Sequence, residues 1–142
     1  MSDALICLEM GDIFQAEGNY PAAADAFHRA IDIDPQFARS YYCQANLERE
    51  LGKYSESFTN YNKAIELDPA IADFYNNRGL LNYEMGNPQD SEADFLKAIE
   101  LRPDEGMFLN NLGVLYQCLN QLEPAKALFE KALAIDPSYL SS

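Results

Sequence analysis

The 142-residue chain has few basic side chains and few of the residues that bind metal ions. Ten Lys and Arg stand against 23 Asp and Glu, which gives a formal net charge of −13, and Trp is absent. Because affinity for nucleic acids and for anionic membrane surfaces comes mostly from basic side chains, this charge argues against both kinds of partner. The only histidine is His28, and Cys7, Cys43 and Cys118 lack the spacing of metal ligands. We therefore expect no metal and no cofactor.

A long apolar run and a basic leader are also missing from the sequence. No apolar stretch approaches the ~20 residues that span a bilayer, and residues 1–10 lack the basic start of a secretory signal. Three scattered cysteines, an odd number, suggest thiols that serve as small apolar residues in a reducing compartment. We expect a cytoplasmic protein.

What the chain does contain is a period of 34 residues. Proline recurs at this step, and so do three other sets of equivalent positions, which we call columns. The first column is aromatic, the second holds Gly or Asn, and the third holds small residues. These positions are Pro35, Pro69, Pro103 and Pro137; Phe27, Tyr61, Phe95 and Phe129; Gly18, Gly52, Gly86 and Asn120; and Gly11, Ala45, Gly79 and Gly113. Four gapless repeats, at about 4–37, 38–71, 72–105 and 106–139, therefore predict a single repeat domain over residues 1–142.

Each repeat predicts two helices. The first, for example Leu5 to Glu17, ends at Gly18, because glycine adopts the left-handed conformation that closes a helix. Asn120 is the residue best able to replace glycine there. The second helix runs from about Pro21 to Ile33, since proline is tolerated in a first turn, and the next proline prevents its continuation. One such pair cannot bury its apolar faces alone, so the repeats must stack.

The period and one run of residues resemble the tetratricopeptide repeat (TPR) pattern. The run is Leu109, Leu112, Gly113, Tyr116, Ala125, Phe129 and Pro137, and Tyr41 and Tyr75 stand where the family expects Trp. The resemblance covers all four repeats. It implies an all-α fold, an α-solenoid in which four helix-turn-helix repeats form a right-handed superhelix. In that family the first helices line a concave face that holds peptides or partner proteins.

The family's groove positions can be mapped onto the first helices of this chain. Asparagines there can pair with a peptide backbone through both donors and an acceptor, and arginines can bind a carboxylate or stack on an aromatic ring. Asparagines with a structural role and solvated arginines explain the same residues. The candidate ligand-binding residues are Arg39, Tyr42, Asn46, Arg49, Asn77, Tyr83 and Asn111. The other positions that map onto the groove are Leu5, Leu8, Asp12, Gln15, Cys43, Asp73, Asn76, Leu80, Met107, Asn110, Val114 and Gln117.

Some TPR domains hold the acidic C-terminal motif of a chaperone with a set of Lys, Asn and Arg side chains. Asn46 and Asn77 fit the Asn places of that set. Tyr42, Met107 and Asn111 stand where Lys, Lys and Arg are wanted. We therefore expect this chain not to bind such a motif.

Enzymatic activity is not expected either. The sequence has no Gly-rich loop followed by Lys and Ser or Thr. A Cys–His nucleophile would need a cysteine near His28, but the three cysteines fall on first helices, where packing or groove lining explains them. The many carboxylates are scattered over outward faces, as a solvated surface requires.

The second and third repeats depart from the pattern at two positions that are apolar in the outer repeats. Gln44 and Arg78 correspond to Met10 and Leu112, and Glu48 and Asn82 correspond to Phe14 and Tyr116. One hypothesis is a polar seam between these repeats, with Glu48 facing Arg78. The alternative is that both side chains reach solvent past the helix edge.

The last predicted helix keeps Leu128, Phe129, Leu133 and Ile135, and only residues 138–142 follow Pro137. TPR arrays commonly carry an extra polar helix over the last repeat. Two functions therefore stay open. The chain is either a scaffold that binds a peptide or protein segment in its groove, or a self-assembling building block that forms a homo-oligomer through residues near Leu133. A third possibility is that the chain is one part of a larger protein whose activity lies elsewhere, and four repeats can also be stable enough to tolerate an open end.

Overall fold

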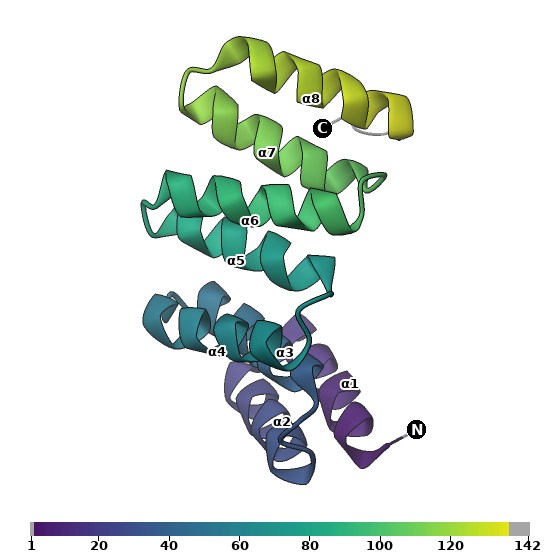
Figure 1. The fold of residues 1–142 in the computed structure, drawn as a ribbon. Helices are drawn as coiled ribbons and strands as arrows, with labels where there is room; N and C mark the ends of the chain where they lie inside the picture. The colour runs from purple at the N-terminus through teal and green to yellow at the C-terminus, as the bar shows by residue number, and fades with distance from the viewer. Residues whose placement is uncertain (1, 137–142) are drawn as a thin grey trace. The chain divides into compact units, whose positions relative to one another are not determined.

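The computed structural model describes residues 2–136, which form α-helices joined by short turns (Figure 1). The helices are α1 (Asp3–Ala16), α2 (Tyr20–Ile33), α3 (Ala38–Glu50), α4 (Tyr54–Leu67), α5 (Ala72–Glu84), α6 (Pro88–Leu101), α7 (Gly106–Cys118) and α8 (Leu122–Ile135). We call the consecutive pairs repeats 1 to 4. Contacts divide the chain into two compact units, Met1–Ala70 with repeats 1 and 2, and Ile71–Ser142 with repeats 3 and 4.

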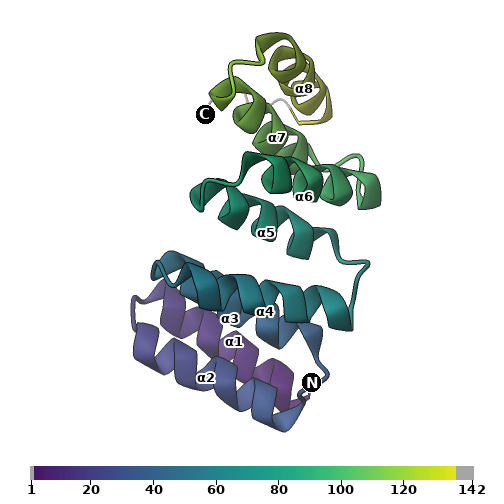
Figure 2. The same cartoon turned by 60° about the vertical axis from the view of Figure 1, so that its left-hand side comes forward.

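The helices pack pairwise. In each repeat the second helix runs back beside the first (Figures 1 and 2). Within each unit the second helix of one repeat also packs on the first helix of the next, α2 on α3 and α6 on α7. The prediction of an all-α fold built from tandem helix-turn-helix repeats is therefore confirmed. The prediction of a single domain over residues 1–142 stays a prediction.

The helix ends follow the glycine column. Gly18, Gly52 and Gly86 have φ of 78°, 77° and 81°, and Asn120 has φ of 60°. The substitution of Asn for Gly at the fourth position is thus confirmed as a left-handed helix stop. The second helix of repeat 1 begins one residue before Pro21 and ends at Ile33, as predicted. The fourth proline and the end of the fourth repeat, residues 137–139, lie outside the described residues.

The small residues lie where the two helices of a repeat cross. A Cβ added at Gly79 would be 2.8 Å from the ring of Phe95, and one at Gly113 would be 2.7 Å from the ring of Phe129. Carbon atoms do not approach this closely, so glycine lets the aromatic column fill the crossing. In repeat 3 the Ser91 hydroxyl also donates to the carbonyl oxygen of Gly79 at 2.8 Å, across the same crossing.

Each unit has its own apolar core. In the first unit, Leu8 and Phe27 of repeat 1 pack with Leu47 of repeat 2. In the second unit, Phe95 of α6 packs with Leu115 of α7 and its neighbours. The aromatic column thus contributes to the packing of one repeat on the next, which a lone helical pair cannot provide.

Repeat 3 contains a partly buried ion pair. Arg78 donates from Nε to Asp94 Oδ2 at 2.9 Å and from Nη2 to Oδ1 at 2.7 Å, and Asn82 Nδ2 donates to Asp94 Oδ2 at 2.9 Å. Burial has the largest single effect and lowers the pKa of Arg78. The hydrogen bonds to Asp94, together with the negative charges of Asp94 and Asp90 nearby, outweigh it and raise the pKa above its ordinary value, so the guanidinium stays charged. We call Arg78, Asn82 and Asp94 the polar triad of repeat 3.

Repeat 2 has a polar triad at the same three positions. Glu48 accepts from Asn60 Nδ2 at 2.6 Å and from Gln44 Nε2 at 3.1 Å. The sequence hypothesis paired Glu48 with Arg78 of the next repeat. That pairing stays a hypothesis. Within its own repeat, each of the two residues has a hydrogen-bond partner on the second helix, Asn60 for Glu48 and Asp94 for Arg78.

Candidate functional site

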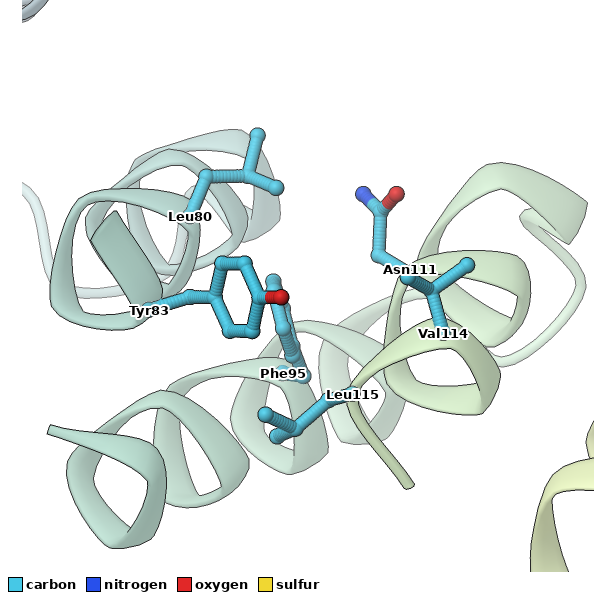
Figure 3. Close-up of a pocket in the computed structure, with 6 residues that line it drawn as sticks. All are labelled: Leu80, Tyr83, Phe95, Asn111, Val114 and Leu115. Atoms are coloured by element: carbon cyan, nitrogen blue, oxygen red, sulfur yellow. The ribbon is translucent and has the colours of Figure 1, made fainter. Parts of the chain in front are cut away.

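The second unit has a pocket between the first helices of its two repeats. It has a volume of about 120 Å³ and is lined by Leu80, Tyr83, Phe95, Asn111, Val114 and Leu115. Figure 3 shows Leu80 and Tyr83 on one side and Asn111 and Val114 on the other, with Phe95 and Leu115 below them. The pocket is apolar apart from the Tyr83 hydroxyl and the Asn111 amide.

The repeat explains how the pocket forms. Leu80 and Val114 are equivalent positions, 34 residues apart, on α5 and α7. Phe95 belongs to the aromatic column that packs under the helix crossing, and it is fully buried together with Leu115. Tyr83 and Val114 are exposed at the rim. The result is an apolar depression with a rigid floor and an open mouth, a shape that suits one apolar side chain of a ligand.

Three asparagines form a hydrogen-bonded chain beside this pocket. Asn111 Nδ2 on α7 donates to Asn76 Oδ1 on α5 at 2.9 Å, and Asn76 Nδ2 donates to Asn77 Oδ1 at 3.1 Å. The first bond fixes the Asn111 amide at the edge of the pocket. Within the described part of the chain, no group donates a hydrogen bond to Asn111 Oδ1, so this atom can accept one from a ligand.

Tyr83 joins α5 to α7 at the other side of the pocket. Its hydroxyl donates to the sulfur of Cys118 at 3.1 Å, and this hydrogen bond raises the pKa of Tyr83 above its ordinary value. The phenol ring is thereby held against α7. The bond helps to keep the rim of the pocket in place when it is empty.

In the first unit, two of the candidate residues share one partner. The rings of Tyr42 and Tyr61 lie 6.1 Å apart with an interplanar angle of 56°. The Tyr61 hydroxyl donates to Asn46 Oδ1. Asn46 therefore has a structural role in fixing the buried Tyr61 of α4. Half-buried Arg49 follows on the last turn of α3.

Arg39 lies at the start of α3, where its charge acts on the carboxyl group of Asp12 and on the thiol of Cys43. Burial raises the pKa of Asp12, and the Arg39 guanidinium opposes this rise. Burial is also the main reason that the pKa of Cys43 rises to about 12, a change that Arg39 again opposes. The thiol is therefore neutral at physiological pH and a weak nucleophile.

The structure thus brings together part of the predicted set. Tyr83 and Asn111 line one pocket, and Asn77 is linked to Asn111 through Asn76. The other four candidates, Arg39, Tyr42, Asn46 and Arg49, belong to the first unit. Phe95 and Leu115 were missed by the sequence analysis. The aromatic column and the 34-residue step did point to these positions, but they indicated only that the side chains belong to the apolar core.

None of the helices within residues 2–136 has the length and apolar character needed to cross a membrane. In the same range, no three His, Cys, Asp or Glu side chains are grouped so as to hold a metal ion.

Three family models match the sequence. A model described as TPR repeat matches residues 45–86, and two described as tetratricopeptide repeat match residues 4–37 and 70–138. The comparison with curated proteins gave no match.

Solved structures of three different proteins have a similar fold. A crystal structure of MamA has a TM-score of 0.83 at 20% identity, over 99% of this chain and 82% of that one. PilF of Pseudomonas aeruginosa has a TM-score of 0.89 at 24% identity, over 95% and 62%. The first TPR of Spaghetti (RPAP3), bound to the HSP90 peptide SRMEEVD, has a TM-score of 0.77 at 24% identity, over 83% and 94%.

Proposed function

Because the chain belongs to the tetratricopeptide repeat family, we propose that it is a protein-interaction module that holds an extended segment of a partner protein. The segment lies along α5 and α7 and places one apolar side chain in the pocket above Phe95. The observation that carries this proposal is the pocket itself, with its buried apolar floor and the Asn111 amide at its edge. Apolar burial supplies affinity, and the amide oxygen accepts from the backbone of the segment.

The chemistry around the pocket favours binding over catalysis. Its two polar groups are an amide and a phenol, and the phenol has a raised pKa, so it is a weak acid at neutral pH. Neither is suited to act as a base or nucleophile near pH 7. Arg39, Tyr42, Asn46 and Arg49 stay predictions of partner contacts made by the first unit.

The proposal can be tested with a display library of random linear peptides, followed by affinity measurements on synthetic copies of the selected sequences. We expect the selected peptides to share one apolar residue. Val114→Glu puts a charge at the pocket mouth and should weaken binding at least about tenfold, since the ligand side chain would bury against a carboxylate. Asn111→Ala should weaken binding by about fivefold, the loss of one hydrogen bond.

The matched control is Leu96→Glu, because Leu96 is an exposed apolar residue of α6 that does not line the pocket. It should leave binding unchanged. A library that yields no binders, or binders that Val114→Glu does not affect, would contradict the proposal.

A second probe is the acidic peptide SRMEEVD, which is bound in the Spaghetti structure. We expect no binding at micromolar concentration. The positions that the resemblance assigns to cations hold Tyr42, Met107 and Asn111, and the chain carries a net charge of −13. Without those cations, the carboxylates of the peptide would lose their water without gaining a partner.

A further inference from the structure

One face of α1 is apolar and exposed. Ile6, Met10 and Ile13 follow one another at steps of four and three residues, so they lie on the same side of the helix. They are 43%, 41% and 60% exposed. Three repeats later, the equivalent residues of α7 are Phe108, Leu112 and Leu115, with exposures of 0%, 2% and 1%. The face that is buried on α7 is thus open on α1.

On α7 this face is covered by the second helix of the preceding repeat. Phe95 and Ile99 of α6 pack against Leu112 and Leu115. The same arrangement occurs in the first unit, where α2 packs on α3 and Phe27 lies against Leu47. A helix of this second-helix type is therefore the element that fits on α1.

The other end of the described chain carries such a helix with its face only partly covered. Phe129 and Leu133 of α8 are equivalent to Phe95 and Ile99 of α6. Phe95 is buried, whereas Phe129 and Leu133 are half-buried. The second-helix face of α8 and the first-helix face of α1 are therefore the two halves of one repeat-to-repeat interface.

We propose that a second copy of this chain docks head to tail, with α8 of one copy on α1 of the next. The docking reproduces the packing of α6 on α7, and the 34-residue step fixes its register. Phe129 and Leu133 of one copy lie against Met10 and Ile13 of the other. The contact joins two different surfaces, so it can continue from copy to copy as a ring or a filament.

The charges at the two faces agree with this pairing. At α6 the position beside Tyr116 holds Glu92, which accepts a hydrogen bond from the phenol. On α8 the equivalent residue is Lys126, and the equivalent of Tyr116 on α1 is Phe14. A cation on an aromatic ring replaces the hydrogen bond. Lys126 also faces a helix that carries Asp3, Glu9 and Asp12 and no basic residue.

The whole chain nevertheless carries a net charge of −13, so two copies repel each other at long range. Salt screens this repulsion and leaves the apolar contact in place. The association should therefore strengthen as the salt concentration rises. This direction is opposite to that of an association held by surface ion pairs.

The test uses light scattering coupled to size exclusion over a wide range of concentration, on the wild-type chain and on Ile13→Glu and Leu133→Glu. We expect the wild-type mass to rise with concentration and each variant to dissociate at least about tenfold more readily. Leu96→Glu, a charge at an exposed apolar site outside both faces, should behave like the wild type. Circular dichroism checks that all three variants are folded.

The decisive arm is a mixture of the two variants. Ile13→Glu keeps an intact α8 face and Leu133→Glu keeps an intact α1 face, so together they should form a dimer that grows no further. A constant monomer mass for the wild type would overturn the proposal. So would an association that Leu133→Glu abolishes and Ile13→Glu does not, because that result means a symmetric contact between two α8 helices.

Discussion

The two inner repeats and the two outer repeats differ at three equivalent positions of the helical hairpin. Repeats 2 and 3 hold hydrogen-bonded polar triads there, and repeats 1 and 4 hold apolar residues. The outer sets are Met10, Phe14 and Ala26, and Leu112, Tyr116 and Leu128; the inner sets are Gln44, Glu48 and Asn60, and Arg78, Asn82 and Asp94. The backbone accepts both chemistries with the same helix pairing.

The comparison shows that these positions accept a polar residue when it has a hydrogen-bond partner, whatever its polarity. A polar group is tolerated beneath the surface when its partner arrives from the other helix of the same repeat. The inner repeats still differ from each other. Asp94 receives three hydrogen bonds, whereas the buried Oε1 of Gln44 receives none from the described residues. Repeat 2 is thus the less completely satisfied of the two.

The largest effect is expected from Asp94→Ala. This change leaves the Arg78 guanidinium without its bidentate partner and Asn82 without its acceptor. The side chains of Arg78 and Asp94 are only 23% and 7% exposed. Breaking such a pair should lower the free energy of unfolding by about 3 kcal/mol, as measured by urea denaturation followed by circular dichroism.

Two controls make this prediction specific to pairing. Leu128→Ala, at the same position of repeat 4, removes only half-buried apolar area and should cost about 1 to 2 kcal/mol. The triple change Arg78→Leu, Asn82→Tyr and Asp94→Leu gives repeat 3 the residues of repeat 4. It should return the stability to within about 1 kcal/mol of the wild type. If Asp94→Ala lowers the free energy of unfolding no more than Leu128→Ala does, the ion pair stabilises repeat 3 no more than the apolar side chain stabilises repeat 4.

A smaller loss is expected from Asn60→Ala in repeat 2. Asn60 donates to Glu48 Oε1 at 2.6 Å, and Glu48 keeps its second donor, Gln44, when Asn60 is removed. The expected cost is about 1 to 2 kcal/mol, the range for one hydrogen bond to a charged group. Thr59→Ala is the control, since Thr59 is the exposed neighbour on the same helix, and it should change stability by less than about 0.5 kcal/mol. Equal effects of the two changes would mean that Glu48 does not need its partner on α4.

The sequence predicted the fold because the signals that define it are local. The left-handed stops at Gly18 and Asn120 depend on the backbone conformation of one residue, and the helix pairs depend on apolar positions a few residues apart. A step of 34 residues then repeats these local signals four times. The chain order alone therefore predicted which helices are paired.

The sequence predicted the site and the triads only in part, because these depend on how helices cross. It identified Tyr83 and Asn111, which lie on first helices, but not Phe95, which reaches the pocket from a second helix. It likewise flagged Glu48 and Arg78 and proposed a contact between them, while Asn60 and Asp94 carried no signal of their own. The 34-residue step does relate Asn60 to Asp94, and a comparison along that column would have pointed to both.

The smallest effect is expected at Tyr116, which occupies in repeat 4 the position of Asn82 and Glu48. Burial, with help from the hydrogen bond to Glu92, raises the pKa of Tyr116 to about 12. An unfolded chain has a tyrosine pKa of about 10, so the folded state holds the proton more tightly. The resulting stabilisation is complete below about pH 10 and is lost as the pH rises from about 10 toward 12.

Tyr116→Phe removes this loss. The stability of the wild type should therefore fall more steeply than that of the variant in this range, while the two differ by less than about 1 kcal/mol at pH 7. Cys43, whose pKa is also about 12, contributes to the slope in both chains and cancels in the difference. Parallel slopes would mean that the phenol of repeat 4 is solvated like a surface group, and the contrast with the paired triads of the inner repeats would then be larger than the structure implies.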